Sequence, residues 1–409
     1  MNVWILQTGE PLHIDEGSLR PMRAMNLADA LVERGHRVTI WSSDFDHFTK
    51  KHRFRKDEVI TVHDNLEIRL IHSRGYQNHF GLDRLFDHAQ MGWNLKKLLR
   101  GESVPDVAFL GYPPIEPAWV MSLWLKRRGV PFYVDVKDAW PEILVRALPK
   151  SLQTAGKILL LPYLLAMKST FKNATALSSI SEPYLNWCRS KIDNEYRKFD
   201  RITPLTSQVI QYSHTELEES RIKLDQLDVT DDGEFRMSFI GTLNSAFDFG
   251  SIISAAKSLG FNLVIAGDGP QLIDLKKICI DHKNIKFLGW ISGAESRTLM
   301  ERTSIMVAPL KDLPDFRMSM PNKFFDAMQN GKSMLTSISG FTGAFIQKNE
   351  IGFEYPANDE FQTTRIISEL MSYPQKLLDQ GERALEIYNE EFSFQKVYSQ
   401  LIDDLEKIR

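Results

Sequence analysis

The chain has 409 residues, of which 43% are hydrophobic and 25% are charged, as is typical of globular proteins. This length exceeds what one hydrophobic core usually serves, so we expect two domains. The formal net charge is -3 and the pI is near 6.4, which argues against a nucleic-acid partner because there is no global basic field. The two cysteines, Cys188 and Cys279, are far apart and indicate neither a disulfide framework nor a zinc site, which fits a reducing cytoplasm.

The first seven residues lack the basic region and the long apolar core of a signal peptide, and they predict a buried first strand. No apolar run reaches the ~18 residues that a membrane-spanning helix needs. We therefore expect no transmembrane segment.

The first half of the chain alternates short apolar runs with amphipathic segments, a pattern that predicts a parallel, doubly wound sheet. The first helix carries Met22, Met25, Ala28 and Val32 at helical spacing and stops at Gly35. Further helices are predicted near residues 82–99 and 116–128, and strands at residues 3–6, 37–41, 65–71, 106–111, 132–136 and 174–180.

The second half repeats this alternation of apolar runs and amphipathic segments, which predicts a second α/β unit. We expect strands at residues 236–241, 262–266, 285–288 and 304–308, and helices at residues 249–259, 270–282 and 293–302. The polar segment 198–233 is the expected linker. The tail 393–408 places Val397, Leu401 and Leu405 on one helical stripe, so a terminal helix must pack on another surface. Two such domains facing across a cleft would bind a ligand at the carboxyl ends of their strands.

The segment 319–332 places a loop, a helix start and polar groups together. Pro321 suits the start of a helix and Gly331 its end, so Lys323 and Asp326 share one face. A cation and a carboxylate beside a helix N-terminus are suited to hold a phosphate and a sugar hydroxyl. The alternative is a surface ion pair worth about 0.2–0.5 kcal/mol.

The segment 266–270 ends one strand and opens the next helix. Gly267 and Gly269 let the backbone approach a ligand, and Pro270 fits the first helical turn. The alternative is a purely structural turn in which Asp268 caps the helix.

The order of these motifs resembles the donor half of family 4 glycosyltransferases with the GT-B fold. The collinear segments are residues 241–243 (GTL), 266–270 (AGDGP), 287–290 (FLGW), 307–310 (VAPL) and 321–328 (PNKFFDAM). In the first half, residues 34–39 (RGHRVT) resemble the join after the first helix. Residues 135–142 (DVKDAWPE) resemble a branch that acts in bacterial surface-polysaccharide assembly.

The resemblance implies two Rossmann-like domains: residues 1–205 for the acceptor, residues 206–390 for the nucleotide sugar, and a helix 391–409 returning to the first domain. It implies a retaining, metal-independent enzyme without a cofactor. Such an enzyme moves a sugar from a nucleotide-diphosphate sugar, UDP-sugar favoured, to a glycan hydroxyl, with a lipid-linked acceptor expected. O-antigen or capsule synthesis would be its setting.

In the donor half, the resemblance assigns the leaving diphosphate to Lys323 and Arg317, because cations and helix N-termini must stabilise it without a metal. Asp326 would bind the ribose hydroxyls through its two carboxylate oxygens. The remaining expected donor contacts of this half are Gly241, Thr242, Gly267, Gly269, Trp290, Pro321 and Asn322. In the first half, the backbone N–H groups of Gly17 and Ser18 are expected to meet the diphosphate.

On the acceptor side, Arg20 and Arg23 lie one turn apart at the start of the first helix and are the expected acceptor contacts, with solvated helix residues as the alternative. Asp138 matches a position near the reacting carbon and is expected to orient the acceptor, because the leaving phosphate can accept the proton. Its alternative is a helix cap or turn residue. Asp135 and Glu142 are weaker rivals.

Two departures from the family pattern change the expected site. Met318 stands where the family has an acidic residue, and residues 242–247 carry no cation where many members have an arginine and a lysine. Diphosphate binding then falls on Arg317, Lys323 and backbone N–H groups after Gly340 or Gly343.

The segment 150–168 combines lysines with an apolar run too short to span a bilayer, and it could lie at a membrane surface near a polyprenyl-linked acceptor. We favour the alternative of a core helix crossing between the domains. Lysines and arginines at 96–97 and 126–128 would add a weak local attraction to a membrane.

Two other functions compete with the transferase. A GT-B-like sugar-nucleotide epimerase would need a cluster of carboxylates and histidines, and the sequence offers no clear one. A non-catalytic nucleotide-sugar-binding partner of a polysaccharide-assembly complex would fit Met318 and the missing cations. A dinucleotide enzyme is disfavoured because no G-x-G-x-x-G follows the first strand.

Overall fold

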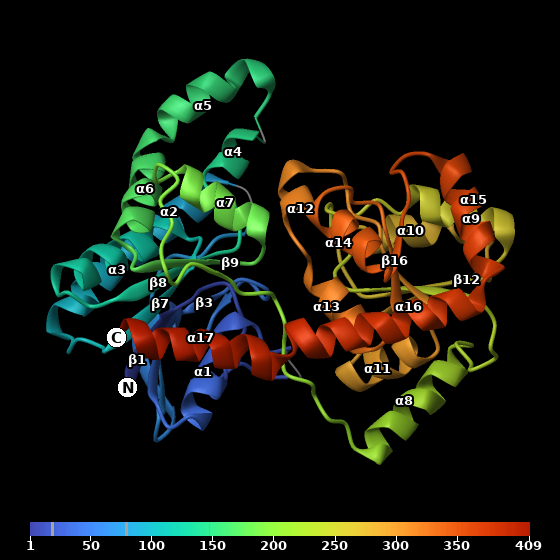
Figure 1. The fold of residues 1–409 in the computed structure, drawn as a ribbon, viewed down its shortest axis with the longest axis horizontal. Coiled ribbons are helices and arrows are strands. Elements are labelled where there is room, and N and C mark those ends of the chain that lie inside the picture. Colours follow the sequence, from blue (N-terminus) through green and yellow to red (C-terminus); the bar gives the residue numbers. More distant parts are fainter. Residues whose placement is uncertain (18–19, 78–80, 147) are drawn as a thin grey trace. The chain divides into compact units, whose positions relative to one another are not determined.

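The computed structural model describes residues 1–17, 20–77, 81–146 and 148–409. The chain divides into two compact units, one made of Met1–Gln208 with Phe394–Arg409 and the other of Val209–Ser393. These divisions fall three residues after the boundaries expected at 205 and 390. Each unit is built around a largely parallel sheet with helices on its faces (Figure 1), so the predicted class of two Rossmann-like α/β units is confirmed.

The described part of the first unit contains an eight-stranded sheet in the order β10-β9-β8-β7-β1-β2-β6-β5. Its strands are β1 (Asn2–Leu6), β2 (Arg37–Ser43), β5 (Glu58–His63), β6 (Leu66–Ile71), β7 (Val107–Tyr112), β8 (Phe132–Val136), β9 (Ala176–Ser179) and β10 (Arg201–Ile202). A separate antiparallel hairpin joins β3 (Phe45–Asp46) to β4 (Lys51–His52).

The expectation of a wholly parallel sheet is wrong at one edge, where β5 runs antiparallel to β6. The residues of β5 alternate between half-buried and exposed, which is the pattern of a strand covered on one face only. Continuous apolar runs do not predict this strand, because its apolar residues recur with a period of two.

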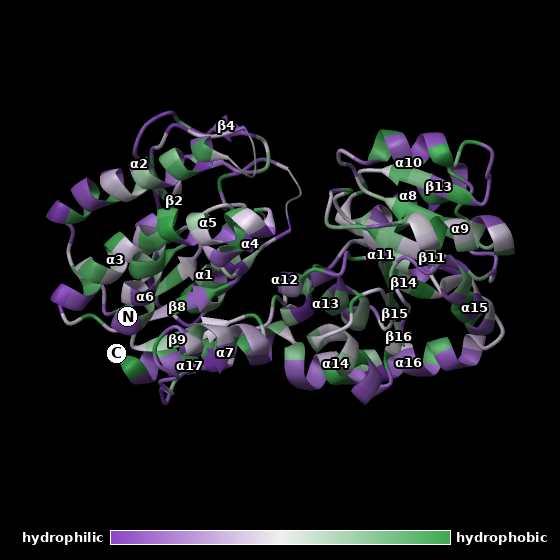
Figure 2. Cartoon of the chain, turned by 90° about the horizontal axis from the view of Figure 1, so that it is seen from above, coloured by the Kyte–Doolittle hydropathy of each residue, from purple (hydrophilic) through white to green (hydrophobic). Residues whose placement is uncertain are grey.

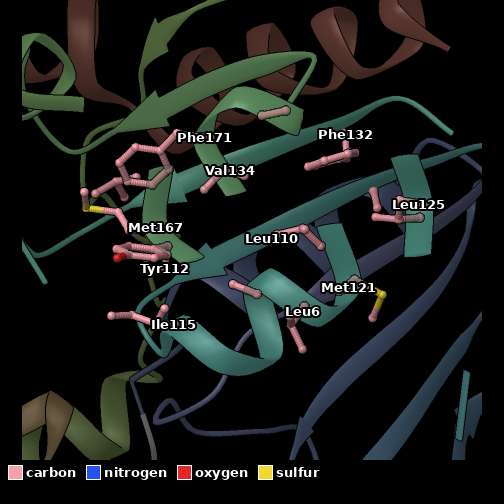
Figure 3. Packing of buried hydrophobic residues seen from close by; sticks show 14 of the residues in the cluster. Leu6, Leu110, Tyr112, Ile115, Met121, Leu125, Phe132, Val134, Met167 and Phe171 are labelled. Atoms are coloured by element: carbon pink, nitrogen blue, oxygen red, sulfur yellow. The ribbon is translucent and has the colours of Figure 1, made fainter. Parts of the chain in front are cut away.

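Strand β1 shows how the two layers of the first unit form. Successive side chains of a strand point to opposite faces, so Trp4 and Leu6 enter one hydrophobic cluster while Val3 and Ile5 enter another. Figure 3 shows the first cluster, in which side chains from the sheet such as Leu110 pack against helical residues. A strand buried on both faces needs a continuous apolar run, and this run is what the first residues of the sequence provide.

The helices of the first unit cover both faces of the sheet. They are α1 (Arg23–Glu33), α2 (Leu82–Leu98), α3 (Ile115–Arg127), α4 (Glu142–Arg146), α5 (Gln153–Leu159), α6 (Leu161–Asn173), α7 (Glu182–Ser190) and α17 (Phe394–Ile408), with short 3-10 turns η1 (Leu99–Gly101) and η2 (Lys150–Leu152).

The terminal helix α17 returns to the first unit, as expected. Its predicted stripe of Val397, Leu401 and Leu405 is buried in the same cluster as Val3 and Ile5 of β1. In Figure 1, α17 lies beside α1. Residues nearly 400 positions apart in sequence therefore share one core.

The favoured interpretation of residues 150–168 as a core helix crossing between domains is wrong. The segment forms η2, α5 and the start of α6, and several of its large apolar side chains face solvent: Ile158 is 70% exposed and Leu159 is 77% exposed. The rest of the segment contacts the core: Leu160 is buried, Tyr163 and Leu164 pack against the hydrophobic cluster, and Met167 of α6 belongs to it. The apolar run is present in the sequence, but part of it faces solvent in the structure.

The second unit has a six-stranded parallel sheet among its described residues, in the order β13-β12-β11-β14-β15-β16. The strands are β11 (Arg236–Ile240), β12 (Asn262–Ala266), β13 (Ile285–Gly289), β14 (Ile305–Ala308), β15 (Ser333–Thr336) and β16 (Gly352–Glu354). In chain order this arrangement is 3-2-1-4-5-6, the order of the doubly wound nucleotide-binding fold.

The helices of the second unit flank this sheet. They are α8 (His214–Gln226), α9 (Gly250–Leu259), α10 (Leu272–Ile278), α11 (Gly293–Glu301), α12 (Pro314–Met318), α13 (Asn322–Gln329), α14 (Phe341–Asn349), α15 (Glu360–Met371) and α16 (Pro374–Ile387), followed by a π turn η3 (Tyr388–Phe392). The predicted linker contains α8, whose start is a capping box formed by Ser213 and Glu216. The strands at the centre of each unit are mostly hydrophobic, and the outer helices carry both hydrophilic and hydrophobic residues (Figure 2).

Among the described residues, none of the helices has the length and apolar character needed to cross a membrane.

Candidate functional site

The strand order of the second unit directs attention to one point on its sheet. The order reverses between β11 and β14, and ligands of open α/β sheets bind outside the carboxyl ends of the strands at such a reversal. The loop at this end of β11 begins with Gly241, and the loop after the neighbouring β12 contains Gly267 and Gly269.

These loops, residues 241–243 and 267–269, pack backbone against backbone, and we call them the glycine layer. A Cβ atom on Gly267 would lie 1.9 Å from the carbonyl oxygen of Gly241, and one on Gly269 would lie 2.4 Å from that of Leu243. The three glycines have φ values of 143°, 137° and 149°, a backbone region that other residues rarely adopt. The two loops are also hydrogen-bonded to each other, because Leu243 N–H donates to the carbonyl oxygen of Asp268 at 2.8 Å. The glycines predicted to allow a close approach therefore approach one another.

Lys323 reaches this glycine layer from α13, which begins directly after Pro321. Its ammonium group donates to the carbonyl oxygen of Ile240 and lies 4.4 Å from the centre of the Phe239 ring. A Cβ atom on Gly241 would lie 1.8 Å from Lys323 Nζ. The structure thus joins two residues, Ile240 and Lys323, that are 83 positions apart in sequence, and it places a half-buried cation at the end of β11.

Two helix N-termini lie in the same region of the second unit. Helix α13 is capped by Pro321 and α14 by Gly340; within the described residues, neither cap makes a side-chain hydrogen bond and neither first turn has an acidic residue. Gly340 packs against the backbone of Arg317. A Cβ atom on Gly340 would lie 2.6 Å from the carbonyl oxygen of Arg317. Helix N-termini of this kind attract anions through their N–H groups.

Asn322 and Asp326 extend this site along α13. Asn322 Oδ1 is buried, and the described part of the chain offers it no hydrogen-bond partner. Asp326 is half-buried and stands one turn after Lys323, on the face that the sequence predicts. A carboxylate in this position is suited to accept hydrogen bonds from a diol.

The remaining predicted donor contacts of the second unit are on the surface. Thr242 is exposed, and Trp290 follows β13 with 67% of its surface exposed. Arg317 lies on α12, where its guanidinium makes a bidentate ion pair with Asp312 at 2.5 Å. This hydrogen-bonded pairing lowers the pKa of Asp312. The ion pair engages two nitrogen atoms of Arg317, which leaves fewer donors for a ligand. Lys323 is therefore the stronger candidate to bind the diphosphate.

In the first unit, sequence reasoning missed Glu10 and Lys137 at the carboxyl edge of the sheet. Glu10 follows β1 and is 6% exposed; it accepts the N–H of Ala24 in the first turn of α1 at 2.9 Å and pairs with Lys137, which follows β8. The signal was present, because Glu10 lies inside the loop 9–23 and Lys137 immediately precedes Asp138. Glu10 satisfies a helix N-terminus that would otherwise bind an anion.

The expected acceptor contact at Arg23 is wrong. Its side chain is 1% exposed, lies 3.2 Å from the carboxylate of Asp135, and donates to the carbonyl oxygens of Thr203 and Pro204. Burial opposes the charge of Arg23, but Asp135 and other anionic neighbours outweigh it and raise the pKa of the guanidinium. Arg23 therefore fastens α1 to the core instead of facing a ligand.

The other predicted residues of this loop are only partly placed. Arg20 is half-buried and precedes α1, so it does not share a helical face with Arg23 as expected. Gly17 is exposed with a φ of 99°. Ser18 lies outside the described residues.

Asp138 is exposed two residues after β8, at the carboxyl edge of the sheet where it is expected. Its carbonyl oxygen accepts the N–H of Trp140 at 2.9 Å, so it also belongs to a turn. The rival Asp135 is fully buried and bonded to Ser178 at 2.6 Å. Burial disfavours the charge of the rival Glu142, but hydrogen bonds from Lys191 and Trp187 outweigh it and lower the pKa of Glu142. Asp138 remains the most accessible of the three.

A cavity of about 300 Å³ lies elsewhere in the first unit. Its lining includes Asn2, Arg37 and Leu66, which stand at the beginnings of β1, β2 and β6. The amino ends of parallel strands are not where this class of fold binds ligands. We therefore do not assign the cavity to the site.

Comparison with known proteins agrees with this geometry. Residues 238–372 match the model of "Glycosyl transferases group 1", and residues 22–195 match that of the "Glycosyl transferase 4-like domain". The chain belongs to family 4 of the GT-B glycosyltransferases. Comparison with curated proteins finds no match.

Solved structures share the fold over the whole chain at low identity. Sucrose-phosphate synthase from Thermosynechococcus elongatus has a TM-score of 0.74 and 14% identity, with 100% of this chain and 98% of that chain covered. HepE of Anabaena in complex with UDP-glucose has a TM-score of 0.66 and 13% identity, with 100% of both chains covered. WaaG, a glycosyltransferase involved in lipopolysaccharide biosynthesis, has a TM-score of 0.65 and 12% identity, with 99% of both covered.

Proposed function

We propose that this glycosyltransferase is a retaining, metal-independent hexosyltransferase that uses a UDP-sugar and transfers the sugar to a hydroxyl of a lipid-linked glycan in bacterial surface-polysaccharide synthesis. The observation that carries the donor half of this proposal is the contact between Lys323 and the glycine layer at Gly241. A cation held at the carboxyl end of β11 is in the place where a doubly wound sheet receives a phosphate-bearing ligand.

The leaving diphosphate is the group that gains negative charge as the glycosidic bond breaks. Lys323 and the N–H groups that open α13 and α14 offer a fixed ammonium and oriented dipoles for that charge. Groups that are already in place stabilise a developing charge without reorganisation. We therefore assign them to transition-state stabilisation, in place of a metal.

Asp326 supports a nucleotide donor, and the choice of UDP among nucleotides rests on one structural neighbour. Asp326 is suited to the ribose diol, and HepE of Anabaena has been solved with UDP, with UDP and glucose, and with UDP-glucose. We assign the base contacts to the backbone around Gly267 and to the loop at Trp290.

On the acceptor side, Asp138 is the group that we assign to orientation of the attacking hydroxyl. In a retaining transfer the departing phosphate oxygen can take the proton of that hydroxyl, so a strong enzymic base is not required. Asp138 is exposed and follows β8, so it is accessible to an acceptor.

A lipid-linked acceptor fits the surface of α5. Ile158 and Leu159 are 70% and 77% exposed, and Lys157 lies between them and the rest of α5. Apolar side chains flanked by lysines bind the interface of an anionic membrane. We infer a peripheral contact with the inner face of the cytoplasmic membrane.

Calorimetry with UDP, GDP and ADP on the full-length protein tests the donor assignment. We expect preference for UDP, and we expect Asp326→Ala to weaken UDP binding by about 1.5–3 kcal/mol through the loss of charged hydrogen bonds. The matched control is Asp274→Ala, an exposed aspartate on α10. Equal UDP affinity in wild type and Asp326→Ala would contradict the assignment.

A non-catalytic nucleotide-sugar-binding partner is the second candidate, favoured by Met318 at the family's acidic position and by the cation-free loop 242–247. Incubation with radiolabelled UDP-sugars and membrane extracts separates the two. Tight UDP binding without sugar transfer or hydrolysis would favour the binding partner.

A further inference from the structure

Three side chains that the transfer site does not use converge at the carboxyl edge of the first sheet. The parallel strands β2 and β6 end together, with Ser43 opposite Ile71. Asp44 directly follows β2 and His72 directly follows β6, and the N–H of Asp44 donates to the carbonyl oxygen of Ile71 at 3.0 Å. The hairpin that follows β2 pairs Phe45 with His52 and so returns a second histidine to the same place.

One carboxylate oxygen serves both imidazoles. Asp44 Oδ2 lies 2.9 Å from His52 Nδ1 and 2.9 Å from His72 Nδ1. The Asp44 side chain is fully buried, whereas those of His52 and His72 are 19% and 33% exposed. The three donor atoms lie within 4.8 Å of one another, so a single ion could contact them all.

The surroundings orient these groups. Asp44 Oδ1 accepts the N–H of Phe54 at 2.7 Å, which leaves Oδ2 for the histidines. His52 Nε2 lies 3.4 Å from the carbonyl oxygen of Arg74. A neutral His52 ring that carries its proton on Nε2 can donate it to this carbonyl oxygen, which only accepts. In that tautomer the lone pair of Nδ1 faces the carboxylate oxygen of Asp44 at 2.9 Å, an arrangement that a cation bound between the two atoms would stabilise.

We propose that Asp44, His52 and His72 bind one Zn²⁺ ion through Asp44 Oδ2 and the two Nδ1 atoms, with water in the fourth position. Two neutral imidazoles and a carboxylate form a donor set that zinc accepts in sites with three protein ligands. The carbonyl oxygen of Arg74 is the outer partner that a zinc-binding histidine usually has. The sequence spacing gave no sign of this site, because its ligands come from two strand ends and a hairpin.

The two contacts with Asp44 would have to open slightly to admit the ion. Donor atoms about 2.1 Å from a tetrahedral ion lie about 3.4 Å apart, so each 2.9 Å contact must widen by about half an ångström. The part-exposed rings of His52 and His72 border solvent, and His52 also lines a cavity of about 300 Å³. The rings can therefore move outward while the buried Asp44 stays in place.

A zinc ion here would fasten the β3–β4 hairpin to the ends of β2 and β6. Binding to the folded chain alone stabilises it by mass action. The ion would have a structural role and take no part in sugar transfer, so the proposal stands or falls independently of the donor site.

The test uses tag-free, full-length protein stripped with a chelator and titrated with Zn²⁺ by calorimetry and with Co²⁺ by visible absorption. We expect one equivalent bound per chain, a visible d–d band typical of four-coordinate cobalt that zinc abolishes, and a zinc-dependent rise in melting temperature. His72→Ala and His52→Ala should each weaken binding at least tenfold and remove the rise in melting temperature.

The matched control is His13→Ala. His13 also lies 2.7 Å from a carboxylate, that of Asp29, but the pair is not part of a three-donor group among the described residues. This variant should bind zinc as the wild type does. Absence of stoichiometric Zn²⁺ or Co²⁺ binding by the wild type would overturn the proposal, and so would unchanged binding in both His52→Ala and His72→Ala. The cluster would then be a carboxylate that accepts two imidazole hydrogen bonds.

Discussion

The ammonium group of Lys323 lies where a side chain on Gly241 would begin, since a Cβ atom on Gly241 would be 1.8 Å from Lys323 Nζ. Glycine is therefore required at position 241 for two reasons. Its φ of 143° is rarely adopted by other residues, and a side chain there would collide with Lys323. This contact ties the end of β11 to the start of α13.

Gly241→Ala should displace Lys323 and abolish most transfer activity. We expect a loss of at least tenfold in kcat and a destabilisation of about 1–3 kcal/mol from the strained backbone. The control is Gly260→Ala: Gly260 also has a positive φ, 75°, but a Cβ atom there would meet nothing within 4 Å. That variant should lose stability and keep its kcat. Equal activity losses in the two variants would mean that backbone strain alone explains the effect.

Lys323→Ala should reduce turnover more than UDP affinity, because the charge that it faces grows in the transition state. We expect kcat to fall by about 100-fold, as for loss of one electrostatic contact to a developing anion. Steady-state kinetics combined with calorimetry separates the two quantities. Lys348→Ala, an exposed lysine of α14, is the control and should match the wild type. Equal losses in affinity and turnover would indicate ground-state binding only.

Arg23→Met should destabilise the first unit by about 3–5 kcal/mol, because it leaves the fully buried Asp135 without its cation. The double variant with Asp135→Asn should recover part of the loss. Urea unfolding followed by fluorescence measures both. Arg34→Met, which breaks an exposed pair with Asp403, should cost less than about 1 kcal/mol. A stable Arg23→Met protein with weak acceptor binding would restore Arg23 to the acceptor site.

Glu116→Gln should stabilise the protein increasingly as the pH rises. Burial among α2, α3 and α6 raises the pKa of Glu116 from 4.5 to about 7. A raised carboxyl pKa means that the folded state holds its proton: the stability this provides is complete below pH 4.5 and is lost as the pH rises toward 7. The variant should gain up to about 3 kcal/mol over the wild type by pH 8.

Unfolding curves from pH 4 to pH 8 test this expectation. Glu219→Gln replaces an exposed glutamate on α8 and should shift the unfolding free energy by less than about 0.5 kcal/mol at every pH. A gain in Glu116→Gln that does not grow with pH would show that Glu116 is already ionised in the folded protein at low pH.

Replacing Ile158 and Leu159 by serine should weaken binding to vesicles of phosphatidylethanolamine and phosphatidylglycerol at least tenfold, because both side chains would leave the lipid interface. Vesicle sedimentation measures the effect. The control replaces Ile278 and Ile280, which are 54% and 81% exposed in the second unit. Identical binding by both double variants and the wild type would contradict the membrane contact.

Much of the architecture was predictable from the sequence because its signals are local. A strand such as β1 is buried on both faces and therefore reads as a continuous apolar run, and the glycines at 241, 267 and 269 mark turns that only glycine makes easily. The stripe of α17 required a partner surface for the same reason. Where the signal had another period, as in β5, the strand was missed.

The site was predictable only in part. Lys323 and Asp326 were found because they share a helix with a clear start. Arg23 was misread, because its spacing is that of an exposed helix residue and its partner Asp135 is 112 positions away. Glu10 was missed for a similar reason, since its contacts are to Ala24 and Lys137.

By itself, the amino-acid sequence determined the two α/β units, their buried strands, the glycine turns and the helix that carries Lys323, because each depends on neighbours within a few residues. Only the tertiary structure decided which of those groups meet: Lys323 with Gly241, Arg23 with Asp135, and Asp44 with His52 and His72. Sheet order brings distant strand ends to one edge, and local periodicity carries no information about which ends become neighbours.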